Sequence, residues 1–111
     1  MSSKRPIFYD TETTGIKPDK DRVIELAGYD PVLDKTFEKL INPECPVPAE
    51  ATAIHNITNE MVSTAPKFEV VAKEWMEFCE GDTVLIAHNN DAFDIHFLRC
   101  EFERANIPMP E

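Results

Sequence analysis

The stretch from Ile7 to Gly15, IFYDTETTG, limits the possible folds of this chain more than any other. Its first three residues are large and apolar, which is typical of a short strand buried on both faces. In an extended chain, residues two apart project from the same side, so Asp10 and Glu12 continue the face that carries Phe8. The sequence therefore predicts a buried strand whose end presents two neighbouring carboxylates, just before the chain turns away at residues 13–15.

Two carboxylates at one strand end repel each other unless a positive charge lies between them. A divalent cation bound by oxygen ligands would neutralise them. The simpler alternative is a strand end that is acidic and solvated. The spacing alone leaves both interpretations open, because D-x-E pairs are common in acidic chains.

The chain is acidic overall, with 21 Asp and Glu against 11 Lys and Arg and a net charge of −10. This balance disfavours broad electrostatic binding to nucleic acid, which needs a basic surface. An acidic protein can still hold a short single-stranded end through metal ions and backbone contacts. The charge therefore argues against avid duplex binding, but it does not exclude action on nucleic acid.

With 111 residues the chain is at most one small domain, residues 1–111. Cys45, Cys79 and Cys100 are odd in number and lack a CxxC spacing, which indicates reduced thiols and not disulfides or a zinc site. No apolar run approaches the ~20 residues of a membrane span, and no signal peptide is evident. We therefore expect a cytoplasmic protein without membrane association.

Hydrophobic periodicity and turn residues predict an α/β fold in the order β-β-β-α-β-α. The strands are expected at residues 7–9, 23–29, 36–41 and 83–87, short helical turns at 50–55 and 58–61, and longer helices at 67–80 and 92–106. Short connections make the first three strands an antiparallel meander. A right-handed crossover returns residues 83–87, expected to be a buried strand, parallel to a strand of this sheet. If that neighbour is the first strand, both carboxyl ends lie side by side, where ligand sites of α/β sheets gather.

Asp94 is a third carboxylate that this topology brings toward Asp10 and Glu12. It borders the apolar stripe of the last helix and does not lie on the solvent face. It could act as a third metal ligand, or it could simply favour the helix dipole and accept backbone N–H bonds. Asp91 is the better candidate for the helix cap, which leaves Asp94 less needed there. Three carboxylates without histidine or thiolate favour Mg²⁺ or Mn²⁺ over zinc, and two such ions ~4 Å apart suit phosphodiester hydrolysis.

Four motifs together resemble the DnaQ-like (DEDD, DEDDh-type) 3′–5′ exonucleases, a family that includes polymerase proofreading subunits and has an RNase H-like fold. They are IFYDTETTG, VIELAGYD, LINPECPVPAEATAIHNIT and VLIAHNNDAFDIHFL, in the order of the family's landmarks. The resemblance implies hydrolysis at nucleic acid 3′ ends, with release of nucleoside 5′-monophosphates. It makes single-stranded DNA the expected substrate and a DNA polymerase a candidate partner.

The resemblance also implies roles for individual residues. Asp10, Glu12 and Asp94 match the acids that hold two Mg²⁺ or Mn²⁺ ions, with Asp10 contacting both. The substrate-binding positions that match are Thr13, Thr14 and Gly15 in the turn whose backbone lies against the terminal nucleotide, Phe93 near that nucleotide, and His55, which in relatives reaches toward the 3′ end. Taken alone, His55 would be a helix-end histidine without a catalytic duty.

The sequence departs from the family in two places. The turn HNNDAFD is one residue longer than the common form, which leaves Asp94 in place. The third motif, a helix with a general-base histidine or tyrosine and a fourth acid, has no match after Asp94, because Glu101, Glu103 and Glu111 have no suitably placed histidine. We therefore expect an RNase H-like domain lacking its C-terminal part, with weak or absent turnover by these 111 residues alone.

Two alternatives to a DNA exonuclease stay open. One is a non-catalytic interaction module associated with a polymerase, although such a module would be expected to have lost at least one of Asp10, Glu12 and Asp94. The other is an RNA-trimming exonuclease of the same superfamily. No sequence feature separates ribose from deoxyribose at the end being cut.

Overall fold

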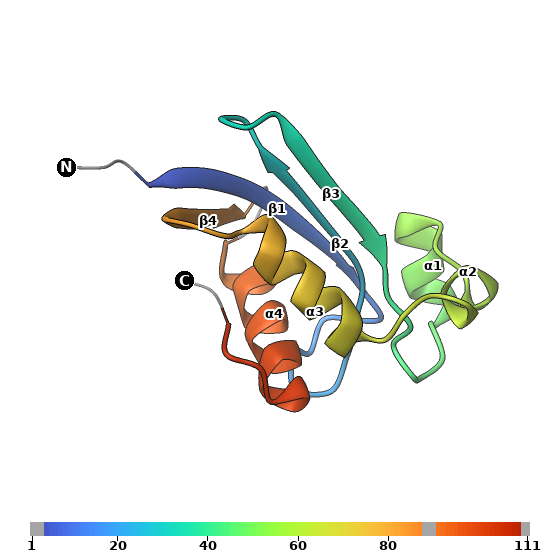
Figure 1. The fold of residues 1–111 in the computed structure, drawn as a ribbon. Coiled ribbons are helices and arrows are strands. Elements are labelled where there is room, and N and C mark those ends of the chain that lie inside the picture. Colours follow the sequence, from blue (N-terminus) through green and yellow to red (C-terminus); the bar gives the residue numbers. More distant parts are fainter. Residues whose placement is uncertain (1–3, 88–90, 110–111) are drawn as a thin grey trace.

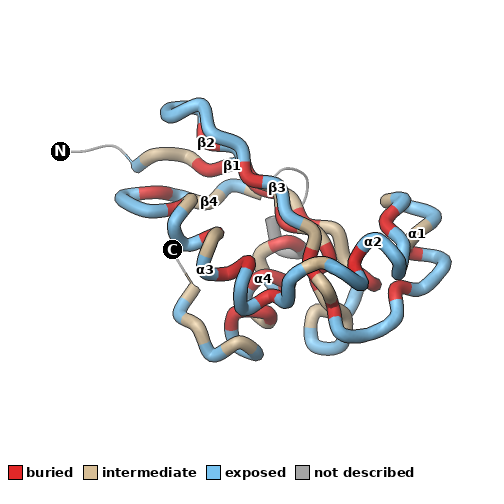
Figure 2. Tube along the Cα trace, turned by 45° about the vertical axis from the view of Figure 1, so that its right-hand side comes forward, coloured by how far each residue is buried: buried red, intermediate tan, exposed pale blue. Residues whose placement is uncertain are grey.

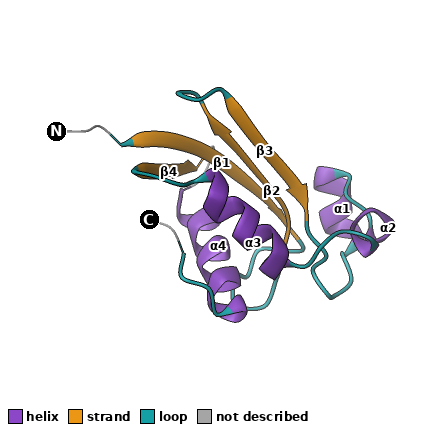
Figure 3. Ribbon diagram, in the orientation of Figure 1, coloured by secondary structure: helices purple, strands orange, loops and turns teal. Residues whose placement is uncertain are grey.

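The computed structural model describes residues 4–87 and 91–109, apart from the side chains of 91–93, and within them strands and helices follow the expected order (Figures 1 and 3). The strands are β1 (Arg5–Thr13), β2 (Val23–Asp30), β3 (Lys35–Leu40) and β4 (Thr83–Ala87). The helices are α1 (Ala49–His55), α2 (Asn59–Ser63), α3 (Phe68–Phe78) and α4 (Asp91–Ala105). The expected boundaries of the elements from β2 onward are thus confirmed to within two residues.

The strands form one mixed sheet in the order β3-β2-β1-β4. β1 pairs with β2, and β2 with β3, in antiparallel register, which confirms the meander. β4 returns parallel to β1, with Tyr9 opposite Ala87. The end of β4 therefore lies beside the middle of β1, and the first turn of α4 lies against Thr11, between the two carboxylates of β1.

Helices α3 and α4 pack side by side on one face of this sheet (Figure 1). The core between the helices and the sheet is centred on Trp75, which is completely buried and meets the Phe37 ring edge-on at a centroid distance of 5.1 Å. Gly28 of β2 makes room for the indole, because a Cβ there would lie 2.6 Å from Cζ3 of Trp75. The helices are thereby held close against the central strands.

The other face of the sheet is open among the described residues, which corrects two expectations (Figure 2). Phe8 of β1 is 41% exposed, and Val84 and Ile86 of β4 are 40% and 38% exposed. Neither strand is therefore buried on both faces: only the side with Ile7 and Tyr9 faces the helices. The sequence shows which residues share a face, but whether that face is covered depends on a layer that the described part of the chain does not place there.

Helices α1 and α2 lie apart from α3 and α4, at the end of the sheet where β1 terminates (Figure 1). Thr58 caps α2, since its hydroxyl accepts a hydrogen bond from the backbone N–H of Met61 at 3.2 Å. α1 ends at His55, and the left-handed backbone of the following Asn56 (φ 63°) turns the chain back. This turn brings His55 to the end of β1.

Candidate functional site

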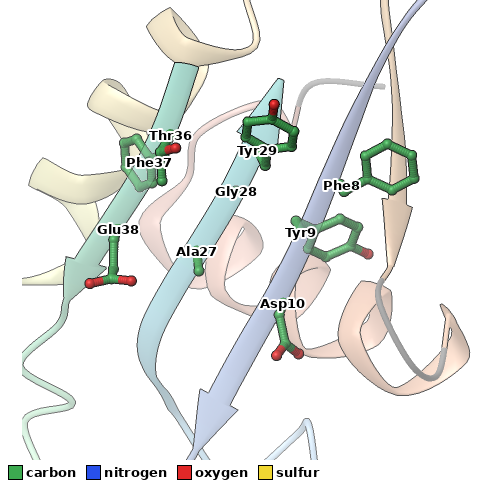
Figure 4. A pocket seen from close by; sticks show the side chains of 9 residues that line it. All are labelled: Phe8, Tyr9, Asp10, Ala27, Gly28, Tyr29, Thr36, Phe37 and Glu38. Atoms are coloured by element: carbon green, nitrogen blue, oxygen red, sulfur yellow. The ribbon is translucent and has the colours of Figure 1, made fainter. Parts of the chain in front are cut away.

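Asp10 and Glu12 of β1 follow the exposed Phe8 along the open face of the sheet, and Figure 4 shows Phe8 and Asp10. Glu12 is paired across the strands with Glu25, while Asp10 is paired with Ala27, which is in turn paired with Glu38. Residues paired in this way share a face, so four acids gather there and not two. Glu25 and Glu38 were missed by sequence reasoning, although strand alternation in VIELAGYD and TFEKL would have shown them.

The charge at this end of the sheet is not neutralised by the described side chains. Burial raises the pKa of Glu12, the carboxylates of Asp10 and Asp94 raise it further, and His55 partly opposes them. Burial likewise raises the pKa of Glu25, followed by the carboxylates of Glu38, Glu12 and Asp10. Raised pKa values mean that the ionised forms are unfavourable here, which is the condition a bound cation would relieve.

Asp94 approaches β1 from the other side, the face covered by the helices. It lies in the first turn of α4, is 3% exposed, and accepts a 2.5 Å hydrogen bond from the Thr11 hydroxyl. Its expected position beside the packed face of the helix is confirmed. Among the described side chains, however, no group of three His, Cys, Asp or Glu is close enough to hold a metal ion. The joining of Asp94 with Asp10 and Glu12 around a metal therefore stays a prediction.

The turn at residues 13–15 is held together by its own hydrogen bonds. The Thr13 hydroxyl donates to the Gly15 carbonyl at 2.6 Å. The buried Thr14 hydroxyl accepts from the Arg22 N–H at 3.0 Å, and the Thr14 N–H donates to the Arg22 carbonyl at 2.9 Å. A Cβ at Gly15 would overlap the Asp21 carboxylate and displace it from the Lys17 N–H that it accepts, so glycine suits this position. The Thr14 side chain thus serves the turn, which leaves its backbone as the part that could meet a nucleotide.

Glu101 ties the loop that follows this turn to α4. Its carboxylate is 1% exposed and accepts hydrogen bonds from Arg22 Nε, at 3.0 and 2.9 Å, and from the Val23 N–H at 2.8 Å. Arg104, one turn further along α4, donates to the Pro18 carbonyl at 2.6 Å. Glu101 is therefore a structural acid that anchors the loop, in line with its rejection as the fourth acid of an active site.

His55 uses both ring nitrogens within the fold. Nδ1 accepts a hydrogen bond from the Ile57 N–H at 3.1 Å, so the ring proton lies on Nε2, which donates to the Thr13 carbonyl at 3.1 Å. The role of His55 at a 3′ end stays a prediction. In this structure His55 joins the end of α1 to the turn that follows Glu12.

A cavity of about 400 Å³ lies between this turn and α1. Thr11, Glu12 and residues 13–16 form one wall, and Pro48, Glu50, Ala51 and Ile54 form the other. Ile16 and Ile54 stand at its sides and are largely exposed, at 77% and 81%. The side chain of Phe93, also expected to bind substrate, lies outside the described residues. The site thus combines carboxylates, a rigid turn and a partly apolar cavity.

Comparison with known proteins identifies relatives for almost the whole chain. The exonuclease family model, RNase_T, matches residues 7–111. A DNA polymerase III subunit epsilon of Rickettsia typhi is 42% identical over 91% of this chain and 45% of its own length. A DNA polymerase III subunit epsilon-like protein of Rhodobacter capsulatus is 41% identical over 84% of this chain and 14% of its own length. The chain therefore spans less than half the length of these two relatives.

Solved structures share the fold. Exonuclease I from Methylocaldum szegediense superposes with a TM-score of 0.80 and 26% identity, covering 93% of this chain and 24% of that one. E. coli exonuclease I in complex with a dT13 oligonucleotide gives a TM-score of 0.80 at 22% identity, covering 95% of this chain and 25% of that one. These matches confirm the RNase H-like α/β fold and the resemblance to DnaQ-like exonucleases. Among the described helices, none has the length and apolar character needed to cross a membrane.

Proposed function

Because the chain belongs to the exonuclease (RNase_T) family, we propose that it is the N-terminal part of a metal-dependent 3′–5′ exonuclease that releases nucleoside 5′-monophosphates from single-stranded DNA. The observation that carries this proposal is the strand end of β1, where Asp10 and Glu12 share one face and the pKa of Glu12 is raised by burial and by its acidic neighbours. Such a strand end is poorly suited to a purely structural role, since it costs stability in the absence of a cation.

The donor atoms at this site suit a hard divalent ion. Asp10, Glu12 and Asp94 offer only carboxylate oxygens, and the nearby His55 uses both ring nitrogens in hydrogen bonds with the backbone. Oxygen ligands without nitrogen or sulfur favour Mg²⁺ or Mn²⁺. We propose these three acids as ligands and catalytic residues. When bound, two ions would stabilise the attacking and leaving oxygens of an in-line displacement at phosphorus.

The turn and the cavity supply a place for the terminal nucleotide. The hydrogen-bonded turn at residues 13–15 presents a fixed backbone, and Ile16 and Ile54 offer apolar surface to a base or sugar. In this proposal Thr13, Thr14, Gly15 and His55 form the substrate side of the site, and Phe93 adds an aromatic ring. The E. coli exonuclease I structure with dT13 supports a single-stranded DNA ligand by analogy.

The open sheet face supports the view that this chain is part of a larger domain. Apolar side chains of β1 and β4 are exposed there, and β4 is an edge strand among the described elements. Exposed apolar faces and free strand edges favour aggregation, and proteins normally cover them. We propose that the third motif, with a general base and a fourth acid, belongs to a segment beyond Glu111. The relatives named as polymerase subunits support a cytoplasmic protein that works with a DNA polymerase.

The test uses a chain continued past Glu111 to the natural stop codon, with a 5′-labelled single-stranded oligonucleotide. We expect stepwise shortening from the 3′ end with Mg²⁺ or Mn²⁺, and loss of activity with EDTA or with Asp10→Ala. Asp19→Ala is the matched control, because Asp19 is an exposed acid of the loop after the turn and should be dispensable. An RNA oligonucleotide of the same sequence tests the RNA-trimming alternative. A folded protein that cuts neither substrate with either metal would contradict the proposal and favour the interaction module.

A further inference from the structure

Thr11 lies between the two carboxylates of β1 but points to the opposite side of the sheet. Asp10 and Glu12 project from the open face, whereas Thr11 faces the helices and is 6% exposed. Its hydroxyl donates to Oδ1 of Asp94 at 2.5 Å, a bond that spans 83 residues of sequence. The three-residue segment 10–12 thus contains two acids of the proposed site and is hydrogen-bonded to the third.

This hydrogen bond is well suited to fix the direction of the Asp94 carboxylate. The carboxylate is almost completely buried, at 3% exposure, so bulk water does not replace the hydroxyl as a donor. Hydrogen bonds from a hydroxyl to a carboxylate are short and strong. Thr11 is β-branched and lies in a strand, so few χ1 rotamers are open to it and the direction of its hydroxyl is well defined. The orientation of Asp94 is therefore set by β1 as well as by α4.

We propose that Thr11 is a positioning residue for metal binding, which holds Asp94 in register with Asp10 and Glu12. This inference rests on the proposed function, because it takes the three acids to be metal ligands. Carboxylates that bind metals are themselves usually oriented by hydrogen bonds, and losing such a partner typically costs about 10- to 100-fold in metal affinity or activity. Thr11 also borders the cavity proposed for the nucleotide, but its hydroxyl is bonded to Asp94, and in this proposal it acts through Asp94.

The decisive comparison is Thr11→Val against Thr11→Ser. Valine keeps the shape and the strand propensity of threonine but removes the hydroxyl, whereas serine keeps the hydroxyl. Thr11→Ala removes the hydroxyl with a smaller side chain, should the valine variant not fold. Thr83→Val is the matched control: Thr83 is a buried strand threonine whose hydroxyl donates to the Cys79 carbonyl at 3.1 Å, beside the start of β1 and away from the carboxylates.

The first measurement is the Mn²⁺ dissociation constant of each variant of the chain continued past Glu111 to the natural stop codon, measured from the EPR signal of free Mn²⁺. We expect Thr11→Val to weaken binding at least about 10-fold, with Thr11→Ser and Thr83→Val near the wild-type value. In the longer, active protein, kcat should fall for Thr11→Val while KM for the oligonucleotide changes little. A merely structural role would instead lower thermal stability alike in Thr11→Val and Thr83→Val without selectively changing Mn²⁺ affinity.

The outcomes separate this inference from the proposed function. If the wild-type protein binds Mn²⁺ and Thr11→Val or Thr11→Ala binds it equally well, the role of Thr11 is overturned and the exonuclease proposal is left intact. If the wild-type protein binds no Mn²⁺, both the inference and the proposed metal ligands are overturned. Weaker binding by Thr11→Val that is restored in Thr11→Ser supports it.

Discussion

Replacing Glu101 by glutamine should strongly destabilise the fold, because it removes the charge from a buried ion pair. The Glu101 carboxylate is 1% exposed, and both of its oxygens lie within 3.0 Å of Arg22 Nε. It also accepts the backbone N–H of Val23 at the start of β2 and lies 3.3 Å from Arg104. Glutamine has the same length but turns an amide NH₂ toward one of these donors.

The expected loss follows from how far each partner is buried. Breaking a fully buried ion pair costs about 3–5 kcal/mol, because the remaining charge is left without a partner. The Arg22 side chain is 19% exposed, so water can partly solvate its guanidinium after the change, and we take the lower end, about 3 kcal/mol. For a protein with a total stability of about 5–15 kcal/mol, this is a large fraction.

Urea unfolding followed by fluorescence measures this loss directly. Trp75 is the only tryptophan of the chain and is completely buried, so its emission reports the opening of the core. With an m-value of about 2 kcal/mol/M, a loss of 3 kcal/mol lowers the midpoint by about 1.5 M. Glu103→Gln is the matched control, because Glu103 lies on the same helix but is exposed, and its midpoint should stay within about 0.25 M of wild type, the equivalent of ±0.5 kcal/mol.

A double-mutant cycle shows whether the ion pair is the cause. Arg22→Gln removes the other charge, so combining it with Glu101→Gln should cost clearly less than the sum of the two single changes. Additive losses would mean that Glu101 acts through the backbone of Val23 and not through Arg22. A midpoint for Glu101→Gln equal to that of Glu103→Gln would refute the reasoning altogether.

Three further changes test other parts of the structure. Gly28→Ala should cost about 1–3 kcal/mol by overpacking against Trp75; an unchanged urea midpoint and emission spectrum would contradict it. Asp30 is buried, which raises its pKa, but hydrogen bonds from two backbone N–H groups and from Arg5 outweigh burial and lower the pKa below its usual 3.8. Ionised Asp30 therefore stabilises the fold above pH 3.8, and this stabilisation is lost as the pH falls through the pKa of Asp30 in the folded protein. Asp30→Asn should flatten the decline of the urea midpoint at acid pH. Declines of equal slope in wild type and variant would argue against it. Burial raises the pKa of Cys79 to about 12, so iodoacetamide at pH 8 should label Cys79 only after unfolding. Mass spectrometry measures the labelling, and rapid labelling of Cys79 in the native protein would count against its burial.

The sequence predicted the order and pairing of the elements because those depend on local signals. Turn residues, apolar periodicity and the handedness of crossovers were enough to place β4 beside β1 and to put α4 next to the carboxylates. The error concerned Phe8, Val84 and Ile86, which were expected inside and lie exposed. An apolar run predicts that a strand prefers burial, but the partner that would bury its second face need not lie within these residues.

The candidate site was predictable where the chemistry lies within one short segment. Asp10 and Glu12 were found from their spacing, and strand register now adds Glu25 and Glu38 to the same face. The roles of Thr11 and Glu101 could not be found in this way, because their partners lie 83 and about 79 residues away in the sequence. Contacts of that kind depend on how α4 packs against β1 and β2.

The position of α4 is the step that links the fold to the proposed chemistry. This helix carries Asp94 in its first turn and Glu101 two turns later. The first is held by the hydroxyl of Thr11, and the second holds Arg22, which in turn bonds to Thr14 of the substrate turn. A shift of α4 would therefore move the third carboxylate and the turn together. The same packing that buries the core thus sets the distance between the proposed metal ligands and the proposed nucleotide site, and both should fail together when α4 is loosened.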